Sequence, residues 1–226
     1  MRLEEVSQYY DKAAGYYDRA TRILGDKVLR LGQWRAYCLE LLGPLQGKTV
    51  LDVGCGTGLN LPGLEARVGP EGYIVAIDYS EGMLAEAQRR VDRNGWHNVA
   101  LRRDDAARLD TVQEPVDAIV AVWSLGIVHD LEAALTAMLD RLKPGGHLAI
   151  MDFGQVYPDR RWLRPLVPLY SSLLEWARID TAEDLDDERL RHRWALGKAR
   201  LKEALTDVTE REYLWGTGFV LGGIRP

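Results

Sequence analysis

The chain has 226 residues and a formal net charge of −5, and 46% of its residues are hydrophobic. This length suffices for one domain with a substantial core and no disulfides, and the acidic balance disfavours nucleic acid as a partner. The two cysteines, Cys38 and Cys55, offer neither a disulfide framework nor a metal site. Because no apolar stretch has the length of a signal-peptide core or a membrane span, we expect a cytoplasmic protein. Any membrane contact would then be peripheral, at the inner face.

The N-terminal segment is predicted to be mainly helical, and a different pattern follows it. Apolar residues between Val28 and Leu41 recur at three- and four-residue spacings, and Gly43-Pro44 gives a stop. Short β-branched runs beginning near residues 49, 73, 99, 116 and 147 are typical of buried parallel strands. Helical patterns at 81–95 and 131–146 lie between them. This alternation predicts an α/β fold with a doubly wound, mostly parallel sheet.

The expected organisation is a single domain of 1–226 with four parts. They are an N-terminal helical lid (1–43), a core (44–153), a helical insert on the acceptor side (154–205) and two final strands (206–226). Together with the five earlier runs, the final strands make a seven-stranded sheet. We expect a monomer or a weak homodimer.

The stretch "TVLDVGCGTGLN", residues 49–60, ends the first predicted strand with three alternating glycines. Gly54, Gly56 and Gly58 permit a tight turn and a close approach of a ligand to the backbone. In such folds, ligands bind at the carboxyl ends of the strands. Leu59 occupies the place of the last glycine in the dinucleotide fingerprint, and the phosphate-loop pattern is absent. The remaining interpretations are another kind of ligand and a purely structural turn.

Acidic residues close the second and third predicted strands. The carboxylate of Asp78 could accept hydrogen bonds from both ribose hydroxyls; the alternative is a helix cap, which Ser80 could supply instead. Asp104 and Asp105 follow the third strand, where a carboxylate could accept a bond from an adenine amino group. For both residues the alternative is an exposed acid that begins a loop.

Five motifs occur in order over roughly residues 45–153, and together they resemble the class I S-adenosylmethionine-dependent methyltransferases. They read "VLDVGCGTGLN", "AIDYSEGML", "RDDAARL", "VDAIVAVWSLGIVHD" and "LKPGGHLAIMDF". The resemblance implies a Rossmann-like methyltransferase fold and S-adenosyl-L-methionine as cofactor, with no metal. It places Asp78 at the ribose and Asp105 with Ala106 at the adenine. The further cofactor-binding residues that we predict are Tyr9, Tyr17, Asp52, Gly54, Cys55, Gly56, Gly58, Tyr79, Met83 and Trp123, of which Asp52 and the glycine turn would surround the methionine part.

Tyr9-Tyr10 and Tyr16-Tyr17 recur seven residues apart, which puts the pairs on one helical face. One interpretation is a helix packed against the domain. The other is a lid whose π faces meet the cationic methyl donor. The resemblance favours the lid, because related enzymes carry a "YD" segment over the cofactor and Tyr17-Asp18 is the matching pair.

His129 and Tyr17 are the catalytic candidates. His129 follows the fourth strand and could accept a proton from the acceptor, although a helix-cap or surface histidine beside Asp130 is the alternative. Asp152, at the end of the fifth strand, is a weaker candidate. The residues predicted to bind the acceptor are Tyr16, Ser124, His129, Arg161 and Trp162.

The acceptor is predicted to be a small molecule or a lipid. The fourth strand ends in "WSLG", unlike the Asn/Asp-Pro-Pro-aromatic motif of DNA and protein amide methyltransferases. The segments "YYDRATRILG", "GTGLNLP" and "GFVLGGIRP" resemble the bacterial phosphatidylethanolamine N-methyltransferases and their ubiquinone/menaquinone-biosynthesis relatives. The amine of phosphatidylethanolamine or a similar phospholipid is therefore the first choice. The alternatives are a quinone-precursor carbon and a soluble metabolite nitrogen or oxygen.

Two questions stay open at the level of sequence. The insert mixes Arg160, Arg161 and Arg164 with large apolar residues, so it could rest on an anionic bilayer or roof the acceptor pocket. A non-enzymatic role, as a cofactor-binding sensor or a subunit of a complex, is the alternative to catalysis.

Overall fold

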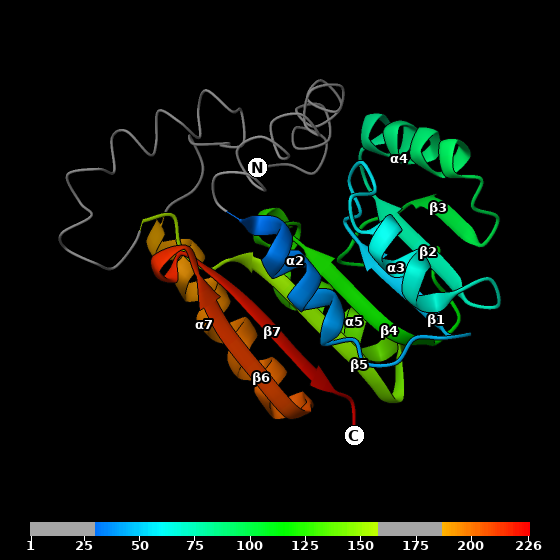
Figure 1. The fold of residues 1–226 in the computed structure, drawn as a ribbon. Helices are drawn as coiled ribbons and strands as arrows, with labels where there is room; N and C mark the ends of the chain where they lie inside the picture. The colour runs from blue at the N-terminus through cyan, green and yellow to red at the C-terminus, as the bar shows by residue number, and fades with distance from the viewer. Residues whose placement is uncertain (1–29, 158–186) are drawn as a thin grey trace.

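The computed structural model describes residues 30–157 and 187–226, which build one seven-stranded sheet (Figure 1). The strand order is β3-β2-β1-β4-β5-β7-β6. Within these ranges β7 pairs antiparallel with both β5 and β6, and the other neighbouring strands pair parallel. The predicted α/β, mostly parallel sheet is therefore confirmed. The strands are β1 (Thr49–Val53), β2 (Tyr73–Asp78), β3 (Val99–Arg103), β4 (Val116–Val122), β5 (Leu142–Phe153), β6 (Thr206–Tyr213) and β7 (Gly218–Ile224).

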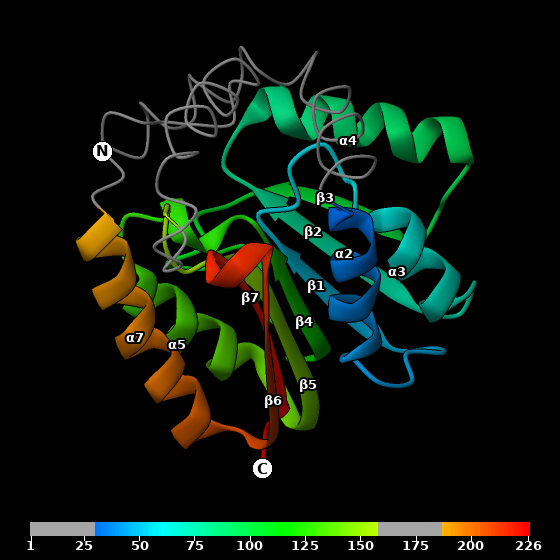
Figure 2. The same cartoon turned by 60° about the vertical axis from the view of Figure 1, so that its left-hand side comes forward.

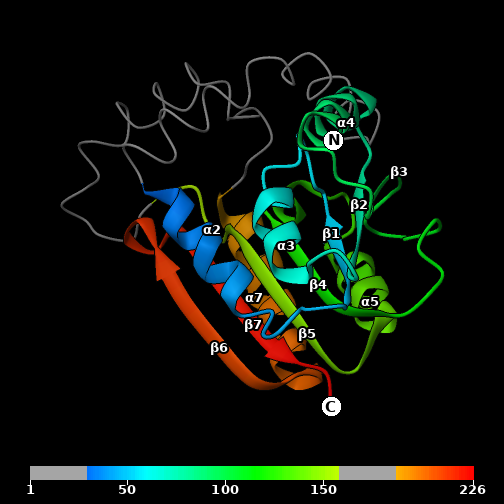
Figure 3. The same ribbon diagram turned by 45° about the vertical axis from the view of Figure 1, so that its right-hand side comes forward.

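Helices cover both faces of the sheet. They are α2 (Leu31–Glu40), α3 (Leu61–Val68), α4 (Glu81–Asn94), α5 (Leu131–Arg141) and α7 (Asp187–Ala204). Figures 2 and 3 show α2 and α3 on one face and α5 with α7 on the other. Successive strand residues serve opposite faces: Val50 packs in the core under α2 and α3, and Leu51 in the core under α5 and α7. Burial on both sides explains why the strands read as continuous apolar runs.

The end of α5 differs from the prediction. The helical pattern runs to residue 146 in the sequence, but the helix ends at Arg141 and β5 begins at Leu142. Leu142 already pairs with Val116, and the register then shifts before the next pair, Ala118 with His147. The Pro-Gly-Gly stretch, which we expected at the end of the helix, lies instead in this irregular part of β5. The short helix α3 follows directly after the glycine turn.

Tyr213 connects the C-terminal hairpin to the rest of the fold. It pairs with Gly218 across β6 and β7, and its buried ring lies over that glycine. A Cβ added at Gly218 would lie 2.1 Å from Cζ of Tyr213. The ring centroid is 5.8 Å from that of Phe153 on β5 and 5.5 Å from that of Trp34 on α2. Gly218 therefore makes room for a ring that joins the sheet to a helix.

We expect Gly218→Ala to lower the free energy of unfolding by roughly 1–3 kcal/mol, because the added methyl group overpacks the site of the Tyr213 ring. Chemical denaturation measures this change. Gly154→Ala is the matched control, since its added Cβ would meet Phe219 Cδ1 at an ordinary 3.4 Å. Equal losses in the two variants would contradict the packing described here.

Candidate active site

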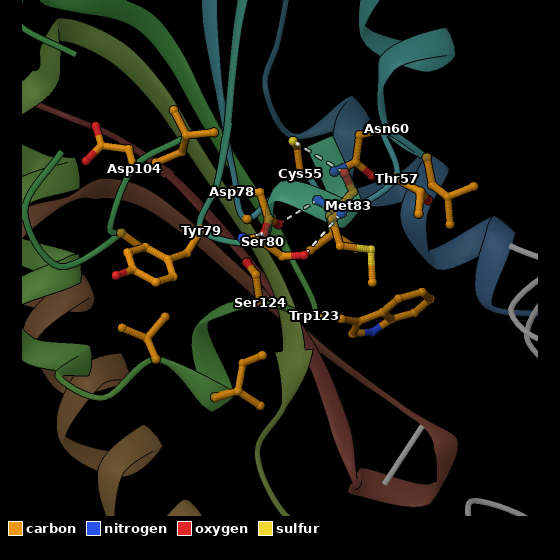
Figure 4. A pocket seen from close by; sticks show the side chains of 18 of the residues that line it. Cys55, Thr57, Asn60, Asp78, Tyr79, Ser80, Met83, Asp104, Trp123 and Ser124 are labelled. Atoms are coloured by element: carbon orange, nitrogen blue, oxygen red, sulfur yellow. Dashed lines mark hydrogen bonds between the residues drawn. The ribbon is translucent and has the colours of Figure 1, made fainter. Parts of the chain in front are cut away.

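A pocket opens where β1, β2, β3 and β4 end (Figure 4). Ten of the predicted site residues line it: Gly54, Cys55, Gly56, Asp78, Tyr79, Met83, Asp105, Ala106, Trp123 and Ser124. The sequence did not single out Arg35, Asn60, Ile127 and Val128, which line it too. Four different strand ends therefore supply one concave site, as expected for a doubly wound sheet.

The turn after β1 is shaped by close contact with the end of β4. A Cβ at Gly54 would lie 2.3 Å from Cβ of Ser124, whose hydroxyl donates to the carbonyl of Val53 at 2.8 Å. Gly54 and Gly56 both have positive φ, of 66° and 55°, which favours glycine. A Cβ at Gly56 would meet no protein atom within 4 Å. Gly54 is thus needed for packing of the protein itself, whereas Gly56 faces the space that a ligand can use.

Asp78 and Ser80 have separate roles. The Asp78 carboxylate accepts hydrogen bonds from the backbone N–H groups of Gly56 at 2.8 Å and Ser80 at 2.9 Å. The Ser80 hydroxyl, in turn, accepts from the Met83 N–H at 3.1 Å and caps α4. Since Ser80 supplies the cap, Asp78 is a half-buried acid held at the centre of the pocket (Figure 4).

The two acids after β3 also differ. The buried Asp104 carboxylate accepts from the N–H groups of Asp105, Asp110 and Thr111 and from the Thr111 hydroxyl, at 2.6–3.1 Å. Asp104 therefore organises its own loop. The Asp105 carboxylate accepts from the Ala107 N–H at 2.9 Å, and Asp105 lines the pocket beside Ala106.

Asp52 lies beneath the glycine turn and is not one of the residues that line the pocket. Its carboxylate accepts from the Asn60 amide at 2.8 Å, and Asn60 in turn accepts from Arg35 Nη1 at 2.7 Å. Burial raises the pKa of Asp52 to about 7, against the opposing effects of the Asn60 hydrogen bond and the Arg35 charge. Asn60 and Arg35 thus lie between Asp52 and a ligand. Gly58 also does not line the pocket; its added Cβ would meet Leu61.

Trp123 has an unusual backbone conformation for a bulky residue, with φ of 54°. Its backbone N–H donates to the Met151 carbonyl at 2.7 Å, and its Nε1 donates to the Tyr213 hydroxyl at 2.8 Å. The Tyr213 hydroxyl itself donates to the Asp152 carbonyl at 3.1 Å. Cζ of Arg35 lies 4.9 Å from the Trp123 ring centroid.

The catalytic candidates lie at different places. His129 is exposed and does not line the pocket, although its neighbour Val128 does. The Asp152 carboxylate accepts from the N–H groups of Leu125, Gly126 and Phe153, at 2.7–2.9 Å, and burial raises its pKa to about 6. It therefore anchors the loop after β4. The role of His129 stays a prediction.

Several predictions lie outside the described residues, namely those for Tyr9, Tyr16, Tyr17, Arg161 and Trp162. Within residues 30–157 and 187–226, no group of three or more His, Cys, Asp or Glu side chains could hold a metal ion. The helices described there are all too short or too polar to cross a bilayer.

Comparison with known proteins identifies the domain. Residues 50–146 match the family described as "Methyltransferase domain". The chain is 32% identical over 152 residues to a demethylmenaquinone methyltransferase of Listeria welshimeri, covering 67% of this chain and 64% of the relative. It is 31% identical over 171 residues to a ubiquinone/menaquinone biosynthesis C-methyltransferase of Pseudomonas putida, covering 75% and 65%. The chain thus spans less than two thirds of the length of these relatives.

Solved structures share the fold. A SAM-dependent methyltransferase from Aquifex aeolicus superposes with a TM-score of 0.64 at 22% identity, covering 94% of this chain and 98% of that one. A SAM-dependent O-methyltransferase from Thermotoga maritima gives a TM-score of 0.58 at 16% identity, covering 85% and 64%. The domain match and these relatives identify residues 50–146 as the methyltransferase domain of a class I S-adenosylmethionine-dependent methyltransferase, and the solved structures share its fold.

Proposed function

We propose that this chain transfers a methyl group from S-adenosylmethionine to a ring carbon of a quinone precursor. The observation that carries the cofactor assignment is the convergence of Gly56, Asp78 and Asp105 with Ala106 in one pocket. The acceptor assignment rests on the relatives, whose names refer to demethylmenaquinone and to ubiquinone/menaquinone biosynthesis. The phospholipid amine, the first choice from the sequence, has no support among these relatives, so its quinone alternative replaces it.

The residues of the pocket fit the three parts of the cofactor. The Asp78 carboxylate is placed to accept hydrogen bonds from the ribose hydroxyls. Asp105 and Ala106 offer a carboxylate and backbone groups to the edge of the adenine. The bare backbone at Gly56 leaves room for the chain that joins the nucleoside to the amino acid.

Alignment is the main contribution expected from the protein. The bound cofactor supplies a methyl group already activated on a sulfonium. Positioning an acceptor in line with such a group can lower a barrier by roughly 7–11 kcal/mol. Trp123, Ile127 and Val128 give the pocket an aromatic and apolar wall, which suits a flat acceptor better than a charged amine.

The acceptor carbon must also lose a proton, and a base next to the pocket would assist this step. His129 adjoins the pocket-lining Val128 and stays our candidate for this role. Asp152 is less suited, because its carboxylate already accepts three backbone N–H groups.

We expect Asp78→Asn to weaken the binding of S-adenosylhomocysteine by roughly 1.5–3 kcal/mol, since a charged acceptor of the ribose hydroxyls is lost. Isothermal titration calorimetry measures the change. Asp92→Asn on the exposed face of α4 is the matched control and should bind like the wild type. An unchanged affinity of Asp78→Asn would mean that the ribose lies elsewhere.

The acceptor is tested by incubating the protein with methyl-labelled S-adenosylmethionine and one of three acceptor preparations. These are reduced demethylmenaquinone, phosphatidylethanolamine vesicles and an extract of soluble metabolites. We expect label on a ring carbon of the quinone, identified by mass spectrometry, and much less label with Asp78→Asn. Label on the phospholipid amine or on a soluble metabolite would contradict the proposed acceptor. Cofactor binding without transfer to any of the three would favour a sensor or a subunit.

A further inference from the structure

Arg35 on α2 is the one basic side chain among the described residues that line the pocket. The lining also contains three acidic residues, Asp78, Asp104 and Asp105. They lie at the strand ends to which we assign the nucleoside. We propose that Arg35 binds the α-carboxylate at the amino-acid end of the cofactor, and that Tyr213 positions Arg35 through Trp123. The inference rests on the proposed use of S-adenosylmethionine and adds a binding residue and a positioning residue to it.

The layout of the pocket places the amino-acid end near Arg35. In Figure 4, Tyr79 and Asp104 lie on one side of Asp78, whereas Asn60, Thr57 and Trp123 lie on the other. With the ribose at Asp78 and the adenine at Asp105, the rest of the cofactor extends toward Asn60 and Trp123. Arg35 contacts both of these residues, through a 2.7 Å hydrogen bond to Asn60 and a 4.9 Å approach to the Trp123 ring.

The chemistry of Arg35 suits a carboxylate. A guanidinium presents parallel N–H groups that match the two oxygens of a carboxylate, and it combines this with stacking on an aromatic ring. Asn60 lies between Arg35 and the buried Asp52, accepting from the former and donating to the latter. The alternative is a purely structural role, in which Arg35 balances the charge of Asp52. An experiment must distinguish this role from carboxylate binding.

The orientation of Arg35 depends on Trp123, and that of Trp123 on Tyr213. Trp123 keeps its strained backbone with the help of its hydrogen bonds to Met151 and Tyr213. The Tyr213 hydroxyl is fixed in turn by the Asp152 carbonyl. Its ring packs against Trp34, the neighbour of Arg35 on α2. Loss of the Tyr213 hydroxyl would therefore release the Trp123 ring over which the guanidinium lies.

Two ligands distinguish binding of the amino-acid end from binding of the nucleoside. S-Adenosylhomocysteine carries the carboxylate, and 5′-methylthioadenosine has the same nucleoside without the amino acid. By calorimetry, we expect Arg35→Gln to weaken S-adenosylhomocysteine binding about 10- to 100-fold and to leave methylthioadenosine binding unchanged. Tyr213→Phe should show the same selectivity with a loss of roughly 3- to 10-fold.

Arg67→Gln on α3 and Tyr73→Phe at the start of β2 are matched controls outside the pocket lining and should bind both ligands like the wild type. Equal losses for the two ligands in Arg35→Gln, or no loss, would overturn the carboxylate assignment and leave Arg35 a structural residue. Equal losses or no loss in Tyr213→Phe would overturn its positioning role. Failure of the wild type to bind S-adenosylhomocysteine would instead overturn the proposed function itself.

Discussion

The close approach of β1 and β4 at Gly54 is the constraint on which the rest of the site depends. Any side chain at that position would collide with Ser124, so only a bare backbone lets the turn cross the strand ends at this distance. The turn can then place the Gly56 N–H against the Asp78 carboxylate. Through these two contacts the ends of β1, β2 and β4 form one site. The pocket therefore depends on the close approach of these strand ends at the carboxyl edge of the sheet.

The chain from β5 onward supports this pocket without supplying any of its described lining residues. Asp152 on β5 holds the backbone of Leu125 and Gly126, and Tyr213 on β6 holds the Trp123 side chain. Both contacts act on the segment after β4, which lies at the pocket. The antiparallel hairpin of β6 and β7 therefore does more than complete the sheet, since its Tyr213 holds the Trp123 side of the pocket.

The sequence revealed those features whose residues lie close together along the chain. Strands showed as β-branched runs, and Asp78 and Asp105 followed them directly, so both could be placed at the edge of the sheet. Arg35, Asn60 and Tyr213 could not be found in this way, because their contacts join residues 25 and 90 positions apart. Asp52 was placed at the cofactor by its position in the motif, but β1 is buried on both faces and Asp52 lies beneath the turn. The acceptor was the weakest prediction, since short segments shared by several relatives did not separate a phospholipid amine from a quinone carbon.

A crystal structure of the chain with S-adenosylhomocysteine would show where each part of the cofactor binds. We expect adenine beside Asp105 and Ala106, the ribose hydroxyls on the Asp78 carboxylate, and the amino-acid end directed along the glycine turn toward Asn60. A ligand whose ribose lies away from Asp78, or one bound outside this pocket, would contradict this placement.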